Sequence, residues 1–255
     1  MRNTLGISAC LLLVMLAACG QEESAPAPEP PAPVPEAATE GAVIVDHVIV
    51  GISDLEMGIE QLEALTGVRA VVGGEHPGRG TRNALISLGS GHYLELLAPV
   101  PGGVIDEFDD LAGDLNRFSE LTPIGFAASS VDMDGLAALL LAEGYQIEGP
   151  VAGSRVKPDG SVLEWRTLAV VQPLLAGAPF FIEWGESSMH PSESSPQGCQ
   201  LSFVQVGGPD AAALGSMASV LGLDIRTAAG DELALEFGLD CPNGAVLISD
   251  NGAGQ

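Results

Sequence analysis

The stretch GGEHPGRGTRN, residues 73–83, gathers side chains that could bind a ligand and move a proton. His76 can act as a general acid or base near neutral pH, or as a metal ligand. Arg79 and Arg82 can each clamp a carboxylate or an enolate-like oxygen, and Asn83 adds an amide. Because glycine lets the backbone approach a ligand closely, we expect a substrate-facing loop. The alternative is a structural loop whose polar side chains satisfy backbone groups.

Two glutamates, Glu95 in HYLELLAP and Glu183 in APFFIEWG, interrupt apolar segments. A buried carboxylate costs several kcal/mol unless it is paired, protonated or metal-bound. With only 9 Lys and Arg in the chain, ion pairing is scarce, which favours catalytic or metal-binding roles. Alternatively, either side chain could face solvent on an alternating strand. His47 follows Asp46 in IVDHVIVGI, where alternation would direct Asp46 to the opposite face.

Arg166 is a further candidate for substrate binding. Trp165, Trp184 and His190 are weaker candidates for lining the site, because tryptophans in strands usually belong to the core. The chain has no GxSxG elbow, P-loop, HExxH or strand-following GxGxxG motif, which argues against the common hydrolases, NTPases, zincins and dinucleotide-binding enzymes.

One arrangement of elements recurs and must position these residues. Apolar alternation and helical spacing predict the order β-α-β-β-β over residues 44–99, again over 122–185, and in shorter form over 199–249. Ser53 and Glu56 suggest a capping box at the start of the first helix. Each unit has one apolar sheet face and one apolar helix face, so the units must pack together into an α+β fold.

A β-α-β-β-β repeat that begins VDHVIVGISDL, continues GGEHPGRGTRNALISLG and closes HYLELLAP resembles the glyoxalase-like branch of the vicinal oxygen chelate superfamily. The later block PFFIEWGESSMHPSESSPQGCQL is also similar to that branch. The resemblance implies the glyoxalase/bleomycin resistance/dioxygenase-like fold, in which curled mixed sheets form a cup around a site.

In metal-using members of that superfamily, the first and last strands of each unit supply the ligands. The resemblance therefore implies His47, Glu95 and Glu183 as ligands of a divalent cation, with Gly125 where a fourth ligand is expected. Such a set suits Zn, Mn, Fe or Mg without choosing among them. His76, Glu95 and Glu183 are the corresponding candidates for catalysis.

The N-terminus resembles a bacterial lipoprotein signal peptide, residues 1–18, with LAAC leading into Cys19. The resemblance implies cleavage before Cys19 and lipidation of its thiol; an ordinary signal peptide or an uncleaved anchor are the alternatives. Residues 19–42 form a Pro/Ala/Glu-rich tether, and residues 43–250 form the glyoxalase-like domain. Gly20 after the cysteine is typical of an outer-membrane lipoprotein facing the periplasm.

Composition limits the partners. A formal charge of −25 argues against nucleic acid and anionic lipid, so we expect membrane contact only through the N-terminal lipid. Cys199 and Cys241 would sit in an oxidising compartment, but spacing alone does not show whether they pair.

Two functions stay open from the sequence. One is a metal-dependent lyase, isomerase or dioxygenase acting on a small oxygen-rich molecule. The other is a lipoprotein that binds a small molecule in the same cup without metal.

Overall fold

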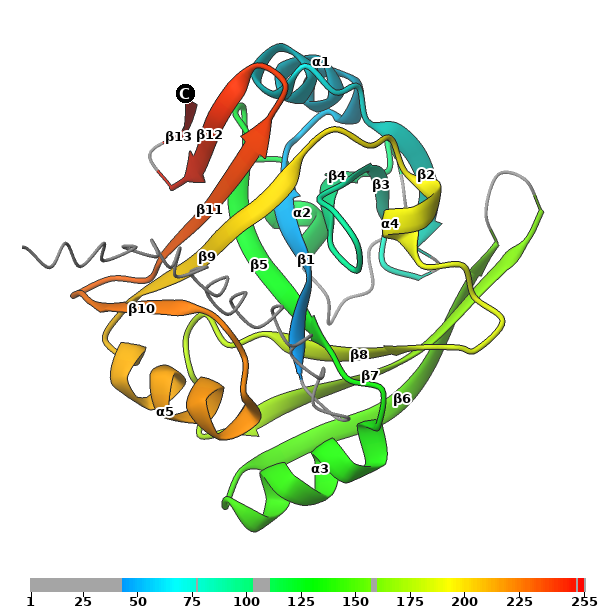
Figure 1. Ribbon diagram of the computed structural model, residues 1–255. Coiled ribbons are helices and arrows are strands. Elements are labelled where there is room, and N and C mark those ends of the chain that lie inside the picture. Colours follow the sequence, from blue (N-terminus) through cyan, green and yellow to red (C-terminus); the bar gives the residue numbers. More distant parts are fainter. Residues whose placement is uncertain (1–42, 77, 103–110, 157–159, 251, 255) are drawn as a thin grey trace, which may run out of the picture. The chain divides into compact units, whose positions relative to one another are not determined.

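The computed structural model describes residues 43–76, 78–102, 111–156, 160–250 and 252–254 of the chain (Figure 1). The predicted signal peptide, Cys19 and the whole of the predicted tether lie outside the described residues. Within these ranges, no helix is long and apolar enough to cross a membrane.

The first two units have the predicted order of elements. The first consists of β1 (Ile44–Gly51), α1 (Leu55–Thr66), β2 (Val71–His76), β3 (Thr81–Ser87) and β4 (Tyr93–Pro99). The second consists of β5 (Thr122–Ser129), α3 (Met133–Ala142), β6 (Gln146–Val156), β7 (Val162–Gln172) and β8 (Phe180–Trp184). Two short helices, α2 (Leu111–Leu115) and α4 (Pro191–Ser194), follow the respective units.

Local chemistry explains the ends of α1. Its N-cap is Asp54, whose carboxylate accepts a hydrogen bond from the backbone N–H of Met57, so the predicted capping box at Ser53 is wrong. Gly67 ends the helix in the left-handed conformation at φ 77°, as the sequence predicts.

The two units join into one eight-stranded sheet with the order β2-β3-β4-β1-β5-β8-β7-β6. Each unit places its last strand parallel to its first, β4 beside β1 and β8 beside β5. The two first strands, β1 and β5, then pair antiparallel and fuse the units. The repeat predicted from the sequence is therefore a structural repeat for these two units.

The sheet curls until its two outer strands meet. A Cβ atom added to Gly73 of β2 would lie 2.5 Å from Asn83 Oδ1 and 3.0 Å from Nη1 of Arg155, which comes from β6. Only glycine permits so close an approach. The curl encloses an inner face, which carries the candidate site.

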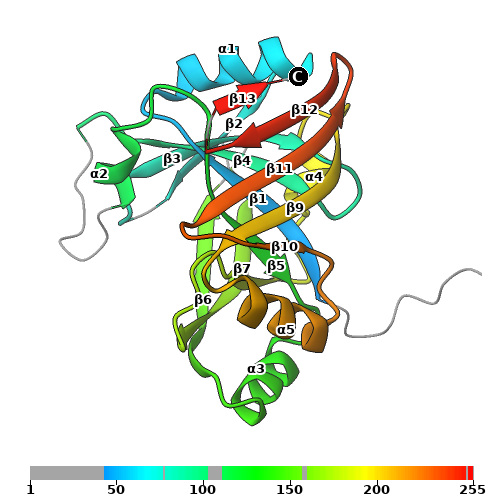
Figure 2. The ribbon, with the colours of Figure 1, turned by 90° about the vertical axis from the view of Figure 1, so that its left-hand side faces the viewer.

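The outer face of the sheet holds the hydrophobic core. Helix α1 packs there through Leu55, Ile59 and Leu62, which share one helical face and are buried. Helix α3 covers the second unit, and a second sheet crosses β1 and β5 between the two helices (Figure 2). A single cluster of buried apolar residues connects all these layers.

That second sheet belongs to the third unit. It consists of β9 (Gln200–Gly208), α5 (Ala211–Leu221), β10 (Arg226–Ala229), β11 (Ala234–Cys241), β12 (Gly244–Ser249) and β13 (Gly252–Gly254).

The third unit has the predicted element order but a different pairing. Its strand order is β10-β9-β11-β12-β13, so the first strand, β9, lies inside the sheet and pairs parallel with β10. The third unit therefore packs as a cover on the outer face and does not add to the cup. A disulfide joins Cys199 to Cys241, which answers the question left open by the sequence.

Candidate functional site

Polar side chains from four strands converge on the inner face of the sheet. His47 on β1 is 3% exposed, Asn83 on β3 is 2% exposed and Glu95 on β4 is 8% exposed. His76, at the end of β2, is half-buried. All four residues lie on neighbouring strands of the first unit. The segment predicted as a loop is mostly the β2–β3 hairpin, with His76 and Asn83 on its strands.

Glu95 is the centre of this cluster. Its Oε1 accepts a hydrogen bond from Asn83 Nδ2 at 2.6 Å and lies 3.3 Å from His76 Nε2. Its Oε2 lies 3.7 Å from His47 Nε2. Burial alone would raise the pKa of Glu95, but hydrogen bonding and charge from His76, the charge of His47 and the Asn83 amide outweigh it and lower the pKa to about 2. Glu95 is therefore an ionised carboxylate at neutral pH.

Asp46 lies on the same side as His47, contrary to the alternation expected from the sequence. The β1–β5 register shifts between Val45 and His47, so Asp46 occupies a β-bulge. Its Oδ1 accepts a hydrogen bond from His47 Nδ1 at 2.7 Å. Because a carboxylate only accepts, His47 carries a proton on Nδ1, and its Nε2 faces Glu95.

The other oxygen of Asp46 binds the second unit. Oδ2 accepts hydrogen bonds from Trp184 Nε1 at 3.0 Å and His190 Nε2 at 3.2 Å. Burial would raise the pKa of Asp46, but the hydrogen bonds and charges of His190 and His47 lower it far below the ordinary range of an aspartate. Trp184 and His190, weak candidates from the sequence, thus support the site through Asp46.

Aromatic rings complete the wall around His47. Tyr93 stacks on the imidazole at a centroid distance of 4.4 Å, and Phe180 meets it edge-on at 5.7 Å. Trp165 packs edge-on against Trp184. Burial and the nearby carboxylates raise the pKa of Tyr93 well above its usual value, so the phenol stays neutral.

Arg155 is a site residue that the sequence analysis missed. It lies on β6, at the far edge of the sheet from Glu95 in strand order, and is 6% exposed. Its Nη1 donates to Asn83 Oδ1 at 2.9 Å, so Asn83 connects Arg155 to Glu95. The only signal in the sequence was an arginine within a glycine-rich apolar strand, which indicates no contact across a curled sheet.

Glu183 does not join the cluster, and the prediction that it converges with His47 and Glu95 is wrong. Its Oε1 accepts from the backbone N–H of Met133 at the start of α3, and its Oε2 accepts from Arg166 Nε at 2.7 Å. Strand alternation turns Phe180 and Trp184 inward, so Glu183 points outward toward α3. Arg166, which also binds Asp134, lies there with it, and neither faces the inner site.

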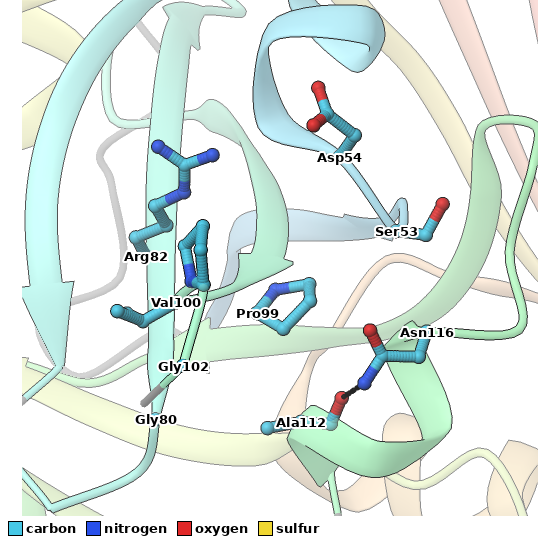
Figure 3. A pocket seen from close by; sticks show the side chains of 10 residues that line it. Ser53, Asp54, Gly80, Arg82, Pro99, Val100, Gly102, Ala112 and Asn116 are labelled. Carbon is cyan, nitrogen blue, oxygen red and sulfur yellow. Dashed lines mark hydrogen bonds between the residues drawn. The ribbon is translucent and has the colours of Figure 1, made fainter. Parts of the chain in front are cut away.

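Arg82 also faces away from the cluster, because it neighbours Asn83 on a strand. Figure 3 shows it beside a separate pocket of about 310 Å³. The pocket lies at the ends of β1, β3 and β4, and its lining includes Ser53, Asp54 and Asn116. Arg79 is exposed on the β2–β3 turn, and its backbone N–H donates to the carbonyl of His76.

The donor set does not fit the predicted metal centre. Among the residues that the structure describes, no group of three or more His, Cys, Asp or Glu side chains is arranged to hold a metal ion. The physical reason is that Glu183 points to the outer face, while Glu95 already accepts hydrogen bonds from its neighbours. We therefore assign no chemical step to a metal.

The comparisons agree with this fold. Residues 45–221, well over half of the chain, match the family model described as a glyoxalase-like domain. The chain belongs to the glyoxalase-like domain family. Its fused pair of β-α-β-β-β units is the vicinal oxygen chelate fold that the sequence predicts.

Comparison with solved structures finds proteins that are similar to this glyoxalase-like protein. A hypothetical protein from Staphylococcus aureus is similar at 19% identity and a TM-score of 0.53, over 81% of this chain and 85% of that one. Methylmalonyl-CoA epimerase from Mycobacterium tuberculosis is similar at 23% identity and a TM-score of 0.39, over 55% of this chain and 85% of that one. None of the curated proteins compared with the chain matches it.

Proposed function

We propose that this glyoxalase-like protein moves a proton between neighbouring carbons of a small oxygen-rich molecule, as an isomerase or lyase does. The observation that carries the proposal is the convergence of His47, His76 and Asn83 on Glu95 at the inner face, with Nε2–Oε distances of 3.7 and 3.3 Å for the two imidazoles. Two imidazoles beside one buried carboxylate supply a base and an acid that both work near neutral pH.

His47 is the proposed base. Asp46 holds its Nδ1–H, so Nε2 is free to take a proton from a carbon that lies next to a carbonyl group. The electron pair of the broken C–H bond forms a carbon–carbon double bond, and negative charge develops on the carbonyl oxygen. The first carbon must bear a hydroxyl group, which loses its proton to become the new carbonyl, while the former carbonyl oxygen gains a proton and becomes the new hydroxyl. His47 returns its proton to the neighbouring carbon, so the isomerisation needs no other reactant.

His76 is the proposed acid for that oxygen. Its Nδ1 lies 2.9 Å from Thr81 Oγ1, and its Nε2 faces Glu95. A proton on Nε2 of His76 is donated to the Glu95 carboxylate in a hydrogen bond and is kept at the site. Glu95 itself, with a pKa of about 2, is too weak a base for this step and serves to orient and charge the imidazoles.

A binding protein without catalysis is the second candidate. The burial of the site and its aromatic wall of Tyr93, Phe180 and Trp184 favour it, because small-molecule sites are lined mostly by hydrophobic and aromatic side chains. Proton exchange separates the two candidates, since a binding protein would capture the ligand and leave its C–H bonds intact.

The test is solvent deuterium exchange. The full chain is incubated in D₂O with a panel of α-hydroxycarbonyl and 1,3-dicarbonyl compounds, and incorporation at carbon is followed by NMR. We expect exchange above the uncatalysed rate for at least one compound class. Exchange no faster than buffer across the panel, together with measurable binding, would favour the second candidate.

We also propose that the chain is exported and lipid-anchored through Cys19, on the periplasmic side of the outer membrane. The Cys199–Cys241 disulfide supports export, because disulfides persist in oxidising compartments. Metabolic labelling with a fatty acid should mark the full chain and fail to mark a Cys19→Ser variant. Equal labelling of both proteins would overturn the proposal.

A further inference from the structure

Arg155 has a position that its hydrogen bonds do not explain. It is 6% exposed and carries five N–H donors on a permanently charged guanidinium. Its one hydrogen bond within the described part of the chain runs from Nη1 to Asn83 Oδ1. A buried cation with so few partners is costly unless an anion joins it.

Other arginines of the chain behave differently. Arg69 pairs with Glu63, Arg117 with Asp114, and Arg166 with Asp134 and Glu183. No carboxylate of the described residues pairs with Arg155, although the chain has 34 Asp and Glu. The most buried arginine of the described domain is thus without a carboxylate partner there.

The free edge of Arg155 suits a carboxylate. Because Nη1 is bound to Asn83, Nε and Nη2 remain, and these two N–H groups form the fork that binds two carboxylate oxygens at once. Asn83 bonds to Arg155 through Oδ1 and to Glu95 through Nδ2. Only the Asn83 side chain would therefore separate an anion bound to Arg155 from Glu95 and the two imidazoles.

A purely structural role is the competing explanation. Arg155 closes the sheet by reaching over Gly73 and Gly74 of β2, and such a latch needs only the bond to Asn83. A latch would not distinguish an anionic ligand from a neutral ligand of the same shape. A residue that binds the ligand's carboxylate would favour the anionic ligand over the neutral one.

We propose that Arg155 is the subsite for a carboxylate group of the ligand, so that the molecule on which this site acts is a small oxygen-rich carboxylic acid. This rests on the proposed function only in placing the ligand on the inner face. His76, whose side chain is 20% exposed against 11% for Glu95, marks the side from which the ligand enters.

The experiment compares malonate with its neutral diamide, malonamide, on the full chain at matched ionic strength, by calorimetry. Wild-type protein should bind malonate at least about tenfold more tightly than malonamide. Arg155→Gln should remove this preference. Arg155→Lys should keep only part of it, because a lysine ammonium cannot donate two parallel hydrogen bonds to one carboxylate as a guanidinium does. Arg226→Gln, which removes an exposed arginine of the third unit, should leave it unchanged.

The wild-type comparison needs no variant to fold. Equal affinity for malonate and malonamide would overturn the inference, as would an Arg155→Gln variant that folds and keeps the preference. Glu95→Gln separates the inference from the proposed function: it should abolish deuterium exchange and still bind malonate through Arg155. Selective binding of malonate without any exchange would support the carboxylate subsite and refute the proton transfer.

Discussion

The two units of the cup share one topology, but they contribute different chemistry. His47 and Gly125 each lie eight residues before the first residue of their helix, Leu55 and Met133. In the parallel strand pairs, Ile49 lies opposite Glu95, and the equivalent Ala127 lies opposite Phe180. Glycine and phenylalanine therefore stand in the second unit where histidine and glutamate stand in the first.

This difference means that each unit contributes a different kind of side chain to the site. The first unit supplies the proposed acid and base groups together with Tyr93, whereas the second supplies Phe180, Trp184 and the buried Arg155. It also explains the error about Glu183. Matching FFIEW to YLEL by sequence places Glu183 at the position of Glu95, but the strand register places Phe180 there, and a shift of three residues reverses the side on which a side chain points.

Substitution of the proposed base in the first unit should have the largest effect, on proton transfer. His47→Gln should lower deuterium exchange by about 10²–10⁴-fold, since a general base contributes about that much. NMR of a compound that the wild type exchanges provides the measurement. His92→Gln, at a histidine that contacts the carbonyl of Val45 outside the cluster, should change the rate little. Equal effects of the two substitutions would contradict a special role for the first unit.

Stability in acid should depend on Glu95. Its folded-state pKa of about 2 lies below the ordinary value of 4.5, so its contribution is present above pH 4.5 and is lost as the pH falls through 2. Wild type should therefore be more stable than Glu95→Gln by on the order of 3 kcal/mol at pH 7, from urea unfolding. The difference should shrink toward pH 2; a difference that stays constant would show that Glu95 is not held as a carboxylate.

The outward-facing glutamate should matter only for packing. Glu183→Gln loses part of its bonds to Arg166 and α3, and should lower the free energy of unfolding by about 1 kcal/mol, because the pair is partly exposed. Deuterium exchange should stay within about twofold of wild type. A loss of deuterium exchange as large as that of His47→Gln would contradict this prediction and show that Glu183 takes part in proton transfer.

Metal should have the smallest effect. Because the described residues hold no group of three or more side chains arranged for a metal ion, added Zn²⁺ or Mn²⁺ at stoichiometric concentration should shift the midpoint of thermal unfolding by less than about 1 °C. Differential scanning calorimetry with and without chelator makes the measurement. A large shift that His47→Gln abolishes would restore the predicted metal centre.

Much of the fold followed from local patterns. Alternating apolar residues predicted the strands, and helical spacing predicted α1 and α3. Glu95 could be chosen because a carboxylate in an apolar strand is costly, His47 through the family resemblance, and His76 and Asn83 because their glycine-rich segment concentrates polar side chains. The bulge that turns Asp46 inward could not be predicted, since it depends on the pairing of β1 with β5.

The amino-acid sequence by itself determined the repeated units, their family and the polar residues of the first unit, because these depend on periodicity and on residue type within one segment. Only the tertiary structure decided which carboxylate faces inward, which arginine reaches the site and how the third unit pairs. Those outcomes depend on strand register and on the curl that brings β2 to β6, and both are set by contacts between segments far apart in the chain.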